Sequence, residues 1–127
     1  VDGVYYFSYA CSGTKTSADG KYQDPTDALG VMSGTGWLIG HITGITVDGV
    51  KLEGDWLRND GAVPVKSALY PEDEKYEFIV DHEGAYERGV WYVYPVVENA
   101  NHSTLLGSKT ESYIDLYMNQ IDIVNAK

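Results

Sequence analysis

The side chains that could perform catalysis are scattered along this sequence and form no recognised catalytic motif. His41, His82 and His102 lie in three separate segments. The sequence contains no Gly-x-Ser-x-Gly elbow, phosphate-binding loop or His-x-x-x-His pair. A glycosidase needs two carboxylates that face each other, and Glu77 and Glu53 are the candidates for such a pair. We therefore expect no enzyme, and a small enzyme with a carboxylate pair is an alternative.

Carboxylates also cluster in three segments that we expect to be loops. Asp24 and Asp27 lie in the first, Asp55 and Asp60 in the second, and "PEDE" at 71–74 forms the third. Calcium prefers such oxygen ligands, although none of these segments follows the order of an EF-hand loop. We expect no cofactor, with a structural calcium held by some of these four aspartates as the alternative.

Aromatic side chains are the remaining candidates for ligand binding. The chain has 11 Tyr and 3 Trp but only 2 Phe, and Tyr suits surfaces that are half exposed. Trp56 has polar neighbours in "LEGDWLRNDGA", and Trp37 follows a flexible Gly-Thr-Gly. Successive side chains of a strand point to opposite faces, so in "VWYVYPVV" a buried Val93 predicts that Tyr92 and Tyr94 are exposed. Exposed rings of this kind can stack on a sugar.

The charge of the chain limits its partners. The formal net charge is −10 and the isoelectric point is near 4.5, which argues against nucleic acid or an anionic membrane because both require Lys and Arg. Cys11 is the single cysteine and cannot form an intrachain disulfide. No apolar run approaches the ~20 residues of a membrane-spanning helix. An uncharged ligand fits this composition best.

Short runs rich in β-branched and aromatic residues, separated by turn signals such as the pair Asp48-Gly49, predict an all-β fold. Such runs are typical of an antiparallel sandwich or barrel. Residues 11–35 are polar and predict a long loop, with at most a short helical turn that Thr26 or Asp24 caps. The length predicts one domain over residues 1–127. The expected strands are 3–10, 36–42, 45–52, 64–70, 75–82, 89–97 and 113–124.

The C-terminal third resembles β-jelly-roll carbohydrate-binding modules. In "SYIDLYMNQIDIVN", residues 117–123 follow the pattern of the closing strand of such modules, and "KYEFIVDHEGAYERGVWYVYPVV" is similar to the strands that line their sugar cleft. The resemblance implies a jelly-roll sandwich of two antiparallel sheets with a concave face lined by aromatic residues. The ligand-binding residues expected on this basis are Trp56, Tyr92, Tyr94, Trp37, Trp91, Tyr117, Asn119 and Gln120.

The expected function is non-catalytic binding of a neutral plant polysaccharide, such as a β-glucan, a xyloglucan or another hemicellulose. The resemblance implies a secreted module tethered to a catalytic domain, a glycoside hydrolase, and we expect it to be a monomer. A chain that starts at Val1 fits a module excised from a larger protein. Three alternatives stay open: a structural or adhesive β-sandwich of a cell-surface protein, a small β-barrel enzyme, and a barrel around a small apolar ligand.

Overall fold

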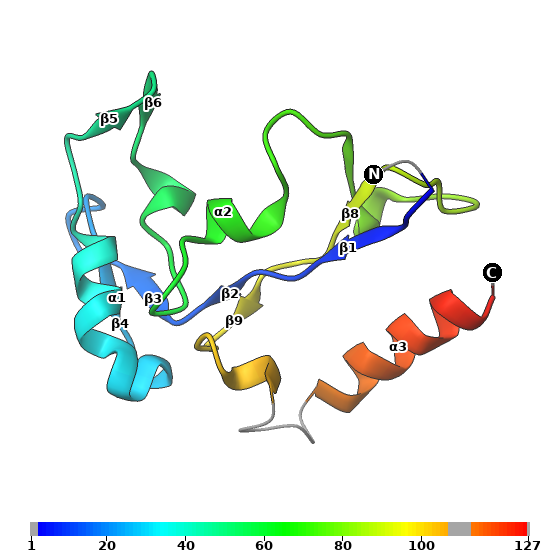
Figure 1. The fold of residues 1–127 in the computed structure, drawn as a ribbon. Helices are drawn as coiled ribbons and strands as arrows, with labels where there is room; N and C mark the ends of the chain where they lie inside the picture. Colours follow the sequence, from blue (N-terminus) through cyan, green and yellow to red (C-terminus); the bar gives the residue numbers. More distant parts are fainter. Residues whose placement is uncertain (1–2, 107–112, 127) are drawn as a thin grey trace.

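The computed structural model describes residues 3–106 and 113–126 and contains short strands, short helices and long connections (Figure 1). The strands are β1 Tyr6–Ser8, β2 Cys11–Ser12, β3 Thr14–Thr16, β4 Gln23–Pro25, β5 Thr46–Val47, β6 Val50–Lys51, β7 Tyr76–Phe78, β8 Trp91–Val93 and β9 Val97–Glu98. The α-helices are α1 Ser33–Gly40, α2 Val65–Leu69 and α3 Ile114–Asn125. The 3₁₀-helices are η1 Asp27–Met32, η2 Gly54–Trp56, η3 Ile79–Asp81 and η4 Thr104–Leu106.

The centre of the fold is a parallel ladder built from segments far apart in the sequence. β8 lies between β1 and β7 and is parallel to both, with Phe7 opposite Tyr92. Further along the same two segments, β2 pairs in parallel with β9 (Figure 1). The prediction of an all-β antiparallel jelly roll is therefore wrong. Pairing direction depends on crossovers between distant segments, which turn residues do not reveal.

Both faces of the central strand are covered. Val93 packs with Ala10, Val65 and Leu69, which places α2 on one face of the ladder. Tyr92 points to the opposite face and is also only 1% exposed. A parallel sheet is typically buried on both faces, so its strands do not alternate between core and solvent. The prediction that Tyr92 is exposed because Val93 is buried is wrong for this reason.

Three segments that we expected to be strands are helical. Residues 33–40 form α1, 65–69 form α2 and 114–125 form α3. A short apolar run fits a buried strand and a buried helix equally well. In α3, the less exposed Leu116, Gln120 and Ile123 recur at helical spacing. The prediction of a closing strand over 113–124 is therefore wrong, because the burial of these residues follows the period of a helix.

Two local predictions are confirmed. The turn expected at Asp48 and Gly49 is present, and both residues have positive φ angles, as a two-residue hairpin turn requires; it divides residues 45–52, expected as one strand, into the hairpin of β5 and β6. The side chain of Thr26 caps η1 by accepting a hydrogen bond from the amide of Ala28. The rest of residues 11–35 is not the expected long loop, because it contains β2, β3 and β4. Among the described residues, no helix combines the length and the hydropathy that spanning a membrane would require.

Candidate functional site

Asp60 lies in a tight turn between η2 and α2 and is held there by backbone amides. Its Oδ1 atom accepts hydrogen bonds from the amides of Ala62, at 2.9 Å, and Val63, at 2.8 Å. Gly61 has a φ of +95°, and a Cβ at this position would lie 2.5 Å from the Cβ of Met32. The turn therefore requires glycine after Asp60, and it fixes the direction of the carboxylate.

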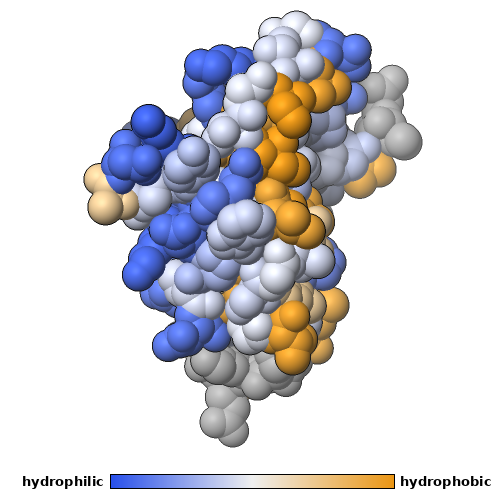
Figure 2. Space-filling view, turned by 90° about the vertical axis from the view of Figure 1, so that its left-hand side faces the viewer, coloured by the Kyte–Doolittle hydropathy of each residue, from blue (hydrophilic) through white to orange (hydrophobic). Residues whose placement is uncertain are grey.

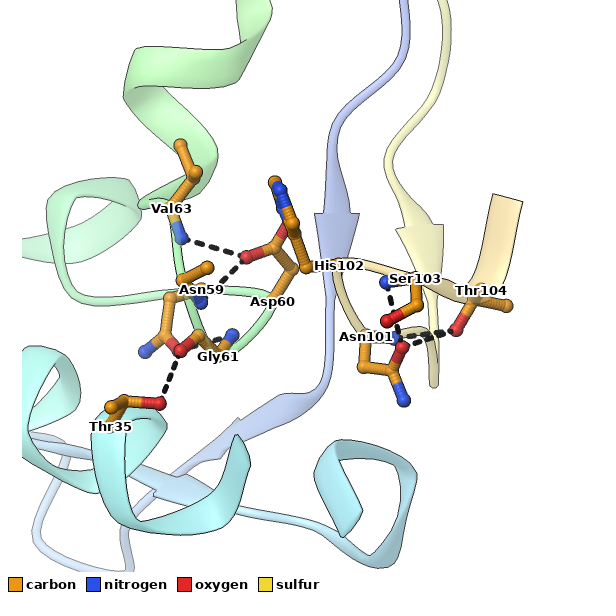
Figure 3. Close-up of polar contacts among 10 residues, drawn as sticks. Thr35, Asn59, Asp60, Gly61, Val63, Asn101, His102, Ser103 and Thr104 are labelled. Carbon is orange, nitrogen blue, oxygen red and sulfur yellow. Dashed lines mark hydrogen bonds and ion pairs between the residues drawn. The ribbon is translucent and has the colours of Figure 1, made fainter. Parts of the chain in front are cut away.

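His102 lies in the loop after β9, with its side chain beside that of Asp60 (Figure 3), and it forms two contacts with Asp60. Its backbone amide donates to the Asp60 carbonyl at 2.9 Å, and its Nδ1 lies 2.8 Å from the Asp60 Oδ2. Next to it, Asn101 Oδ1 accepts hydrogen bonds from the Ser103 amide and the Thr104 hydroxyl. The loop is thus held on both sides of His102.

This geometry sets the roles of the two imidazole nitrogens of His102. An ionised carboxylate only accepts hydrogen bonds, so Nδ1 carries the proton that it donates to Asp60. Nε2 then has a free lone pair. The Asp60 side chain is 9% exposed and the His102 side chain is 50% exposed. A buried carboxylate that orients a half-exposed imidazole is the arrangement of a general base.

Asn59 fixes the turn of Asp60 against α1. Its side chain is completely buried; it donates to the carbonyls of Gly36 and Leu57 and accepts from the amide of Gly61. Thr35 of α1 adds a hydrogen bond to the Gly61 carbonyl at 2.5 Å (Figure 3). The carboxylate is therefore supported by a network of buried polar contacts, which keeps its position well defined.

Cys11 lies near this site and is kept as a thiol. Burial raises the pKa of its thiol to about 11, and the negative charge of Asp60 adds to this increase. A thiol with such a pKa is almost entirely protonated at neutral pH, so it is a poor nucleophile. The reactive groups of the site are thus the carboxylate and the imidazole.

Two further histidines pair with carboxylates, but in less suitable geometry. His82 Nδ1 lies 2.9 Å from Glu77 Oε2, and its ring stacks on Tyr86. Its Nε2 is buried, with no hydrogen-bond partner within the described ranges. His41 contacts Asp24 at 3.4 Å. In the pair of Glu77 and His82, the carboxylate is the more exposed partner and the imidazole is enclosed, which is the reverse of Asp60 and His102.

The structure does not bring the aromatic residues expected to bind a sugar into one surface. Trp37 is in α1, Trp56 is in η2, and Trp91 stacks on Tyr6 at 4.8 Å. Tyr117 is on α3 and donates a hydrogen bond to the Leu105 carbonyl.

Three of these residues do lie together, at the contact of α3 with the strands. The Asn119 side chain donates to the Tyr94 hydroxyl, and Gln120 accepts from the Tyr9 hydroxyl, both at 3.2 Å. The rings of Tyr9 and Tyr94 stack at 4.2 Å. These contacts are internal to the chain and hold α3 in place. The residues expected to bind a sugar therefore do not form a common binding surface.

The other three aspartates named as calcium ligands contact basic side chains or lie in a helix. Asp55 pairs with Arg58 at 3.0 Å, Asp24 contacts His41, and Asp27 lies in the first turn of η1. Within residues 3–106 and 113–126, no three His, Cys, Asp or Glu side chains are grouped to hold a metal ion. Calcium binding stays a prediction, without a ligand set in the described residues.

Sequence reasoning named Asp60 and His102 separately and missed that they form a pair. They are 42 residues apart, and nothing in a single sequence joins them. The available signal was the order of a carboxylate in a turn followed later by a histidine, because this is the order of the last two catalytic residues in α/β-hydrolases. Because that order is common by chance, only the geometry of the structure identifies the pair.

Comparisons with known proteins cover most of the chain. Residues 2–121 match the family model described as "Lipase-like, C-terminal domain". A lipase of Staphylococcus hyicus is 30% identical over 122 residues, covering 96% of this chain and 17% of that protein. Lipase 2 of Staphylococcus aureus is 27% identical over 104 residues, covering 82% of this chain and 14% of its own length. The chain thus spans about one sixth of these relatives or less.

Solved structures agree with the sequence comparisons. The crystal structure of Staphylococcus hyicus lipase superposes with a TM-score of 0.72 at 25% identity, covering 100% of this chain and 33% of that chain. EstA from Clostridium botulinum gives a TM-score of 0.70 at 25% identity, covering 85% of this chain and 26% of that chain. Both likenesses extend over most of the fold described above.

These findings overturn the resemblance to carbohydrate-binding modules and the polysaccharide-binding function inferred from it. The pattern in residues 113–124 that carried the resemblance is the helix α3. The expectation that the domain belongs to a larger protein agrees with relatives that are several times longer than the chain. The chain belongs to the family of lipase-like C-terminal domains.

Proposed function

We propose that this domain supplies the carboxylate and the imidazole of a hydrolase that cleaves ester bonds through a serine nucleophile. The observation that carries the proposal is the 2.8 Å contact between Asp60 Oδ2 and His102 Nδ1, with the carboxylate buried and the imidazole half exposed. The family match and the lipase relatives support the choice of an ester as the substrate class.

Each residue has a definite role in this reaction. His102 Nε2 takes the proton of the serine hydroxyl as its oxygen attacks the ester carbonyl, and the resulting imidazolium gives that proton to the leaving alcohol. Water then cleaves the acyl-enzyme in the same two steps. Asp60 keeps His102 in the Nδ1–H tautomer and stabilises the imidazolium. The two amides that bind Asp60 Oδ1 keep the carboxylate directed at His102.

The nucleophile is proposed to come from the rest of the parent lipase. Among the described residues, no hydroxyl is hydrogen-bonded to His102 Nε2, and Ser103 beside it directs its amide to Asn101. The nucleophile precedes the carboxylate and the histidine in α/β-hydrolases, and this domain forms the C-terminal part of lipases. We therefore propose that the domain alone hydrolyses no ester and acts only within the whole enzyme.

Kinetics of the parent lipase with single substitutions tests the proposal. Asp60→Asn keeps the shape of the side chain but favours the wrong tautomer of His102, and it should lower kcat on a soluble ester by about 10⁴-fold. Glu77→Gln is the matched control, because it alters the other close carboxylate–histidine pair. That control should leave kcat within a few-fold of the unaltered lipase. Equal losses in both variants would contradict the assignment.

The remaining expectations belong to the same proposal. We propose that residues 1–127 act as one monomeric unit within an extracellular parent lipase. The net charge of −10 supports this, because it favours solubility and opposes self-association. Detection of the parent lipase in the culture medium, together with sedimentation of the domain, checks location and monomeric state.

A further inference from the structure

Asn101 directly precedes His102 and forms hydrogen bonds in two directions. Within its own loop, its Oδ1 accepts from the Ser103 amide at 2.9 Å and from the Thr104 hydroxyl at 3.2 Å. Its Nδ2 donates to the Ala28 carbonyl of η1 at 3.0 Å, and Figure 3 shows this nitrogen on the side away from Ser103 and Thr104. The side chain thus shapes the loop of His102 and also ties it to a segment 73 residues earlier.

The segment at the other end of this tie is itself fixed. The hydroxyl of Thr26 donates to the Gly13 carbonyl at 2.7 Å and accepts from the amide of Ala28. Leu29 of η1 is completely buried. A Cβ at Gly13 would lie 2.3 Å from the Leu29 Cδ2 and 3.0 Å from the Ala100 carbonyl oxygen. Because η1 and the loop of His102 both pack closely against Gly13, the Ala28 carbonyl is an anchor with a well-defined position.

The tie closes a ring of contacts that joins the two residues of the candidate site. The Gly13 amide donates to the Asn59 carbonyl at 2.9 Å, and Asn59 directly precedes Asp60. The Asp60 carbonyl in turn accepts from the His102 amide at 2.9 Å. These links are bonds between backbone groups, and so is a further bond between the residue that caps η1 and Gly13. The bond of the Asn101 amide to η1 is the link of this ring that a side-chain substitution removes.

We propose that Asn101 is a positioning residue for ester hydrolysis, whose tie to η1 sets the placement of His102 Nε2 relative to the serine of the parent lipase. The inference rests on the proposed function, because Asn101 acts through His102. The contact with Asp60 holds the imidazole at Nδ1, and a ring held at one atom can pivot about it. A general base must lie within hydrogen-bond reach of its proton, and a displacement of about 1 Å can lower a rate on the order of 100-fold.

The two directions of hydrogen bonding explain why this position suits asparagine. An amide side chain has an oxygen that accepts and a nitrogen that donates. A serine at this position would keep an acceptor for the Ser103 amide, as hydroxyl side chains do in turns, but it is too short to reach the Ala28 carbonyl. An alanine would lose both functions. The substitutions Asn101→Ser and Asn101→Ala therefore separate the tie from the local turn.

Kinetics of the parent lipase with these substitutions tests the proposal. Both variants should lower kcat by on the order of 10- to 100-fold and leave KM within a few-fold of the unaltered enzyme. Because η1 leads into α1, on whose side of the molecule hydrophobic residues gather in a band (Figure 2), the substrate is a short-chain, fully dissolved ester. Adsorption of aggregated substrate then does not enter kcat. Circular dichroism, well below the melting temperature, gives the folded fraction to which kcat is referred.

Asn119→Ala is the matched control, because it makes the same change and removes a hydrogen bond to Tyr94, outside the ring. It should leave kcat unchanged. A second measurement separates positioning from a loss of stability. His102→Ala should reduce kcat to a residual level, and adding Asn101→Ala should lower it no further, because Asn101 acts through His102. Asn101→Ser retains the turn of the loop, so it decides the test if Asn101→Ala does not fold.

Four outcomes would overturn the proposal. In three of them, Asn101→Ala keeps a normal kcat, Asn101→Ser has a normal kcat, or Asn101→Ala lowers the residual activity of His102→Ala by the same factor as in the unaltered enzyme. In each of these, His102→Ala still loses activity, so the proposed function stands and only the role of Asn101 falls. In the fourth, His102→Ala keeps full activity, which would overturn the proposed function and this inference together.

Discussion

Substitution of Asn59 by alanine should destabilise the domain strongly, although the residue lies outside the apolar core. Its buried side chain makes three hydrogen bonds, two to carbonyls and one from an amide. Each such bond contributes about 0.5–1.5 kcal/mol, so the three together give about 1.5–4.5 kcal/mol. The loss should lie in the upper half of this range, because Gly61 N–H would be left buried without its acceptor.

Urea denaturation followed by circular dichroism measures this loss as a change in the free energy of unfolding. Asn119→Ala is the control, because it removes one exposed hydrogen bond of 3.2 Å to Tyr94. It should change the free energy of unfolding by at most about 0.5 kcal/mol. Asn59→Asp should be at least as harmful as Asn59→Ala, because an oxygen would face two carbonyl oxygens. A loss below about 1 kcal/mol in Asn59→Ala would refute the reasoning.

Three other perturbations have definite expected results. Gly40→Ala should destabilise the domain by about 1–3 kcal/mol, because the new Cβ would lie 2.0 Å from the Gln23 carbonyl oxygen; Gly34→Ala in the same helix meets no atom within 4 Å and should be neutral or stabilising in the same urea assay. Alkylation of native Cys11 should be very slow at pH 8 and accelerate towards pH 11, because its thiol pKa is raised to about 11. The Cys11 thiol ionises at lower pH in the unfolded chain than in the folded one. The contribution of this group to the free energy of unfolding is therefore fully present below its unfolded pKa, and it is lost as the pH rises through its folded pKa. A calcium chelator tests the calcium prediction, for which the described residues provide no grouped ligand set; a lower melting temperature would support calcium binding, and an unchanged melting temperature would contradict it.

Local features of the fold could be predicted where one residue type decides the geometry. The turn at Asp48 and Gly49 and the cap at Thr26 are of this kind, and both are confirmed. The faces of the strands were wrong. In β7, Tyr76 and Phe78 alternate with Glu77 as the apolar face of a half-buried strand would, but they are 46% and 44% exposed. Burial of a strand face depends on what packs over it, and period-two alternation carries no information on that.

The helices show a second limit of sequence reasoning. "GWLIGHI" contains two glycines, which disfavour helix, yet residues 33–40 form α1. A Cβ at Gly36 would lie 2.3 Å from Leu29 Cδ1, and one at Gly40 would lie 2.0 Å from the Gln23 oxygen. These glycines allow close packing of α1 on its neighbours, so tertiary contact outweighs their low helix propensity. Such contacts are invisible until the fold is known.

The candidate site, too, could be predicted only in part from the sequence. Asp60 in its turn was recognisable as a functional carboxylate, but the sequence suggested calcium as its partner. His102 was one of three scattered histidines, and all three contact a carboxylate in the structure. Burial of the acid together with exposure of the imidazole distinguishes one pair, and both properties arise from packing.

The most direct test of the central claim is a crystal structure of the parent lipase after reaction with an organophosphate ester, which labels a catalytic serine covalently. Our account predicts that the Oγ of the labelled serine, supplied by another part of the lipase, lies about 2.6–3.2 Å from His102 Nε2. The contact between His102 Nδ1 and Asp60 should be retained in that structure. A labelled serine whose nearest imidazole is His41, His82 or a histidine outside this domain would contradict the account.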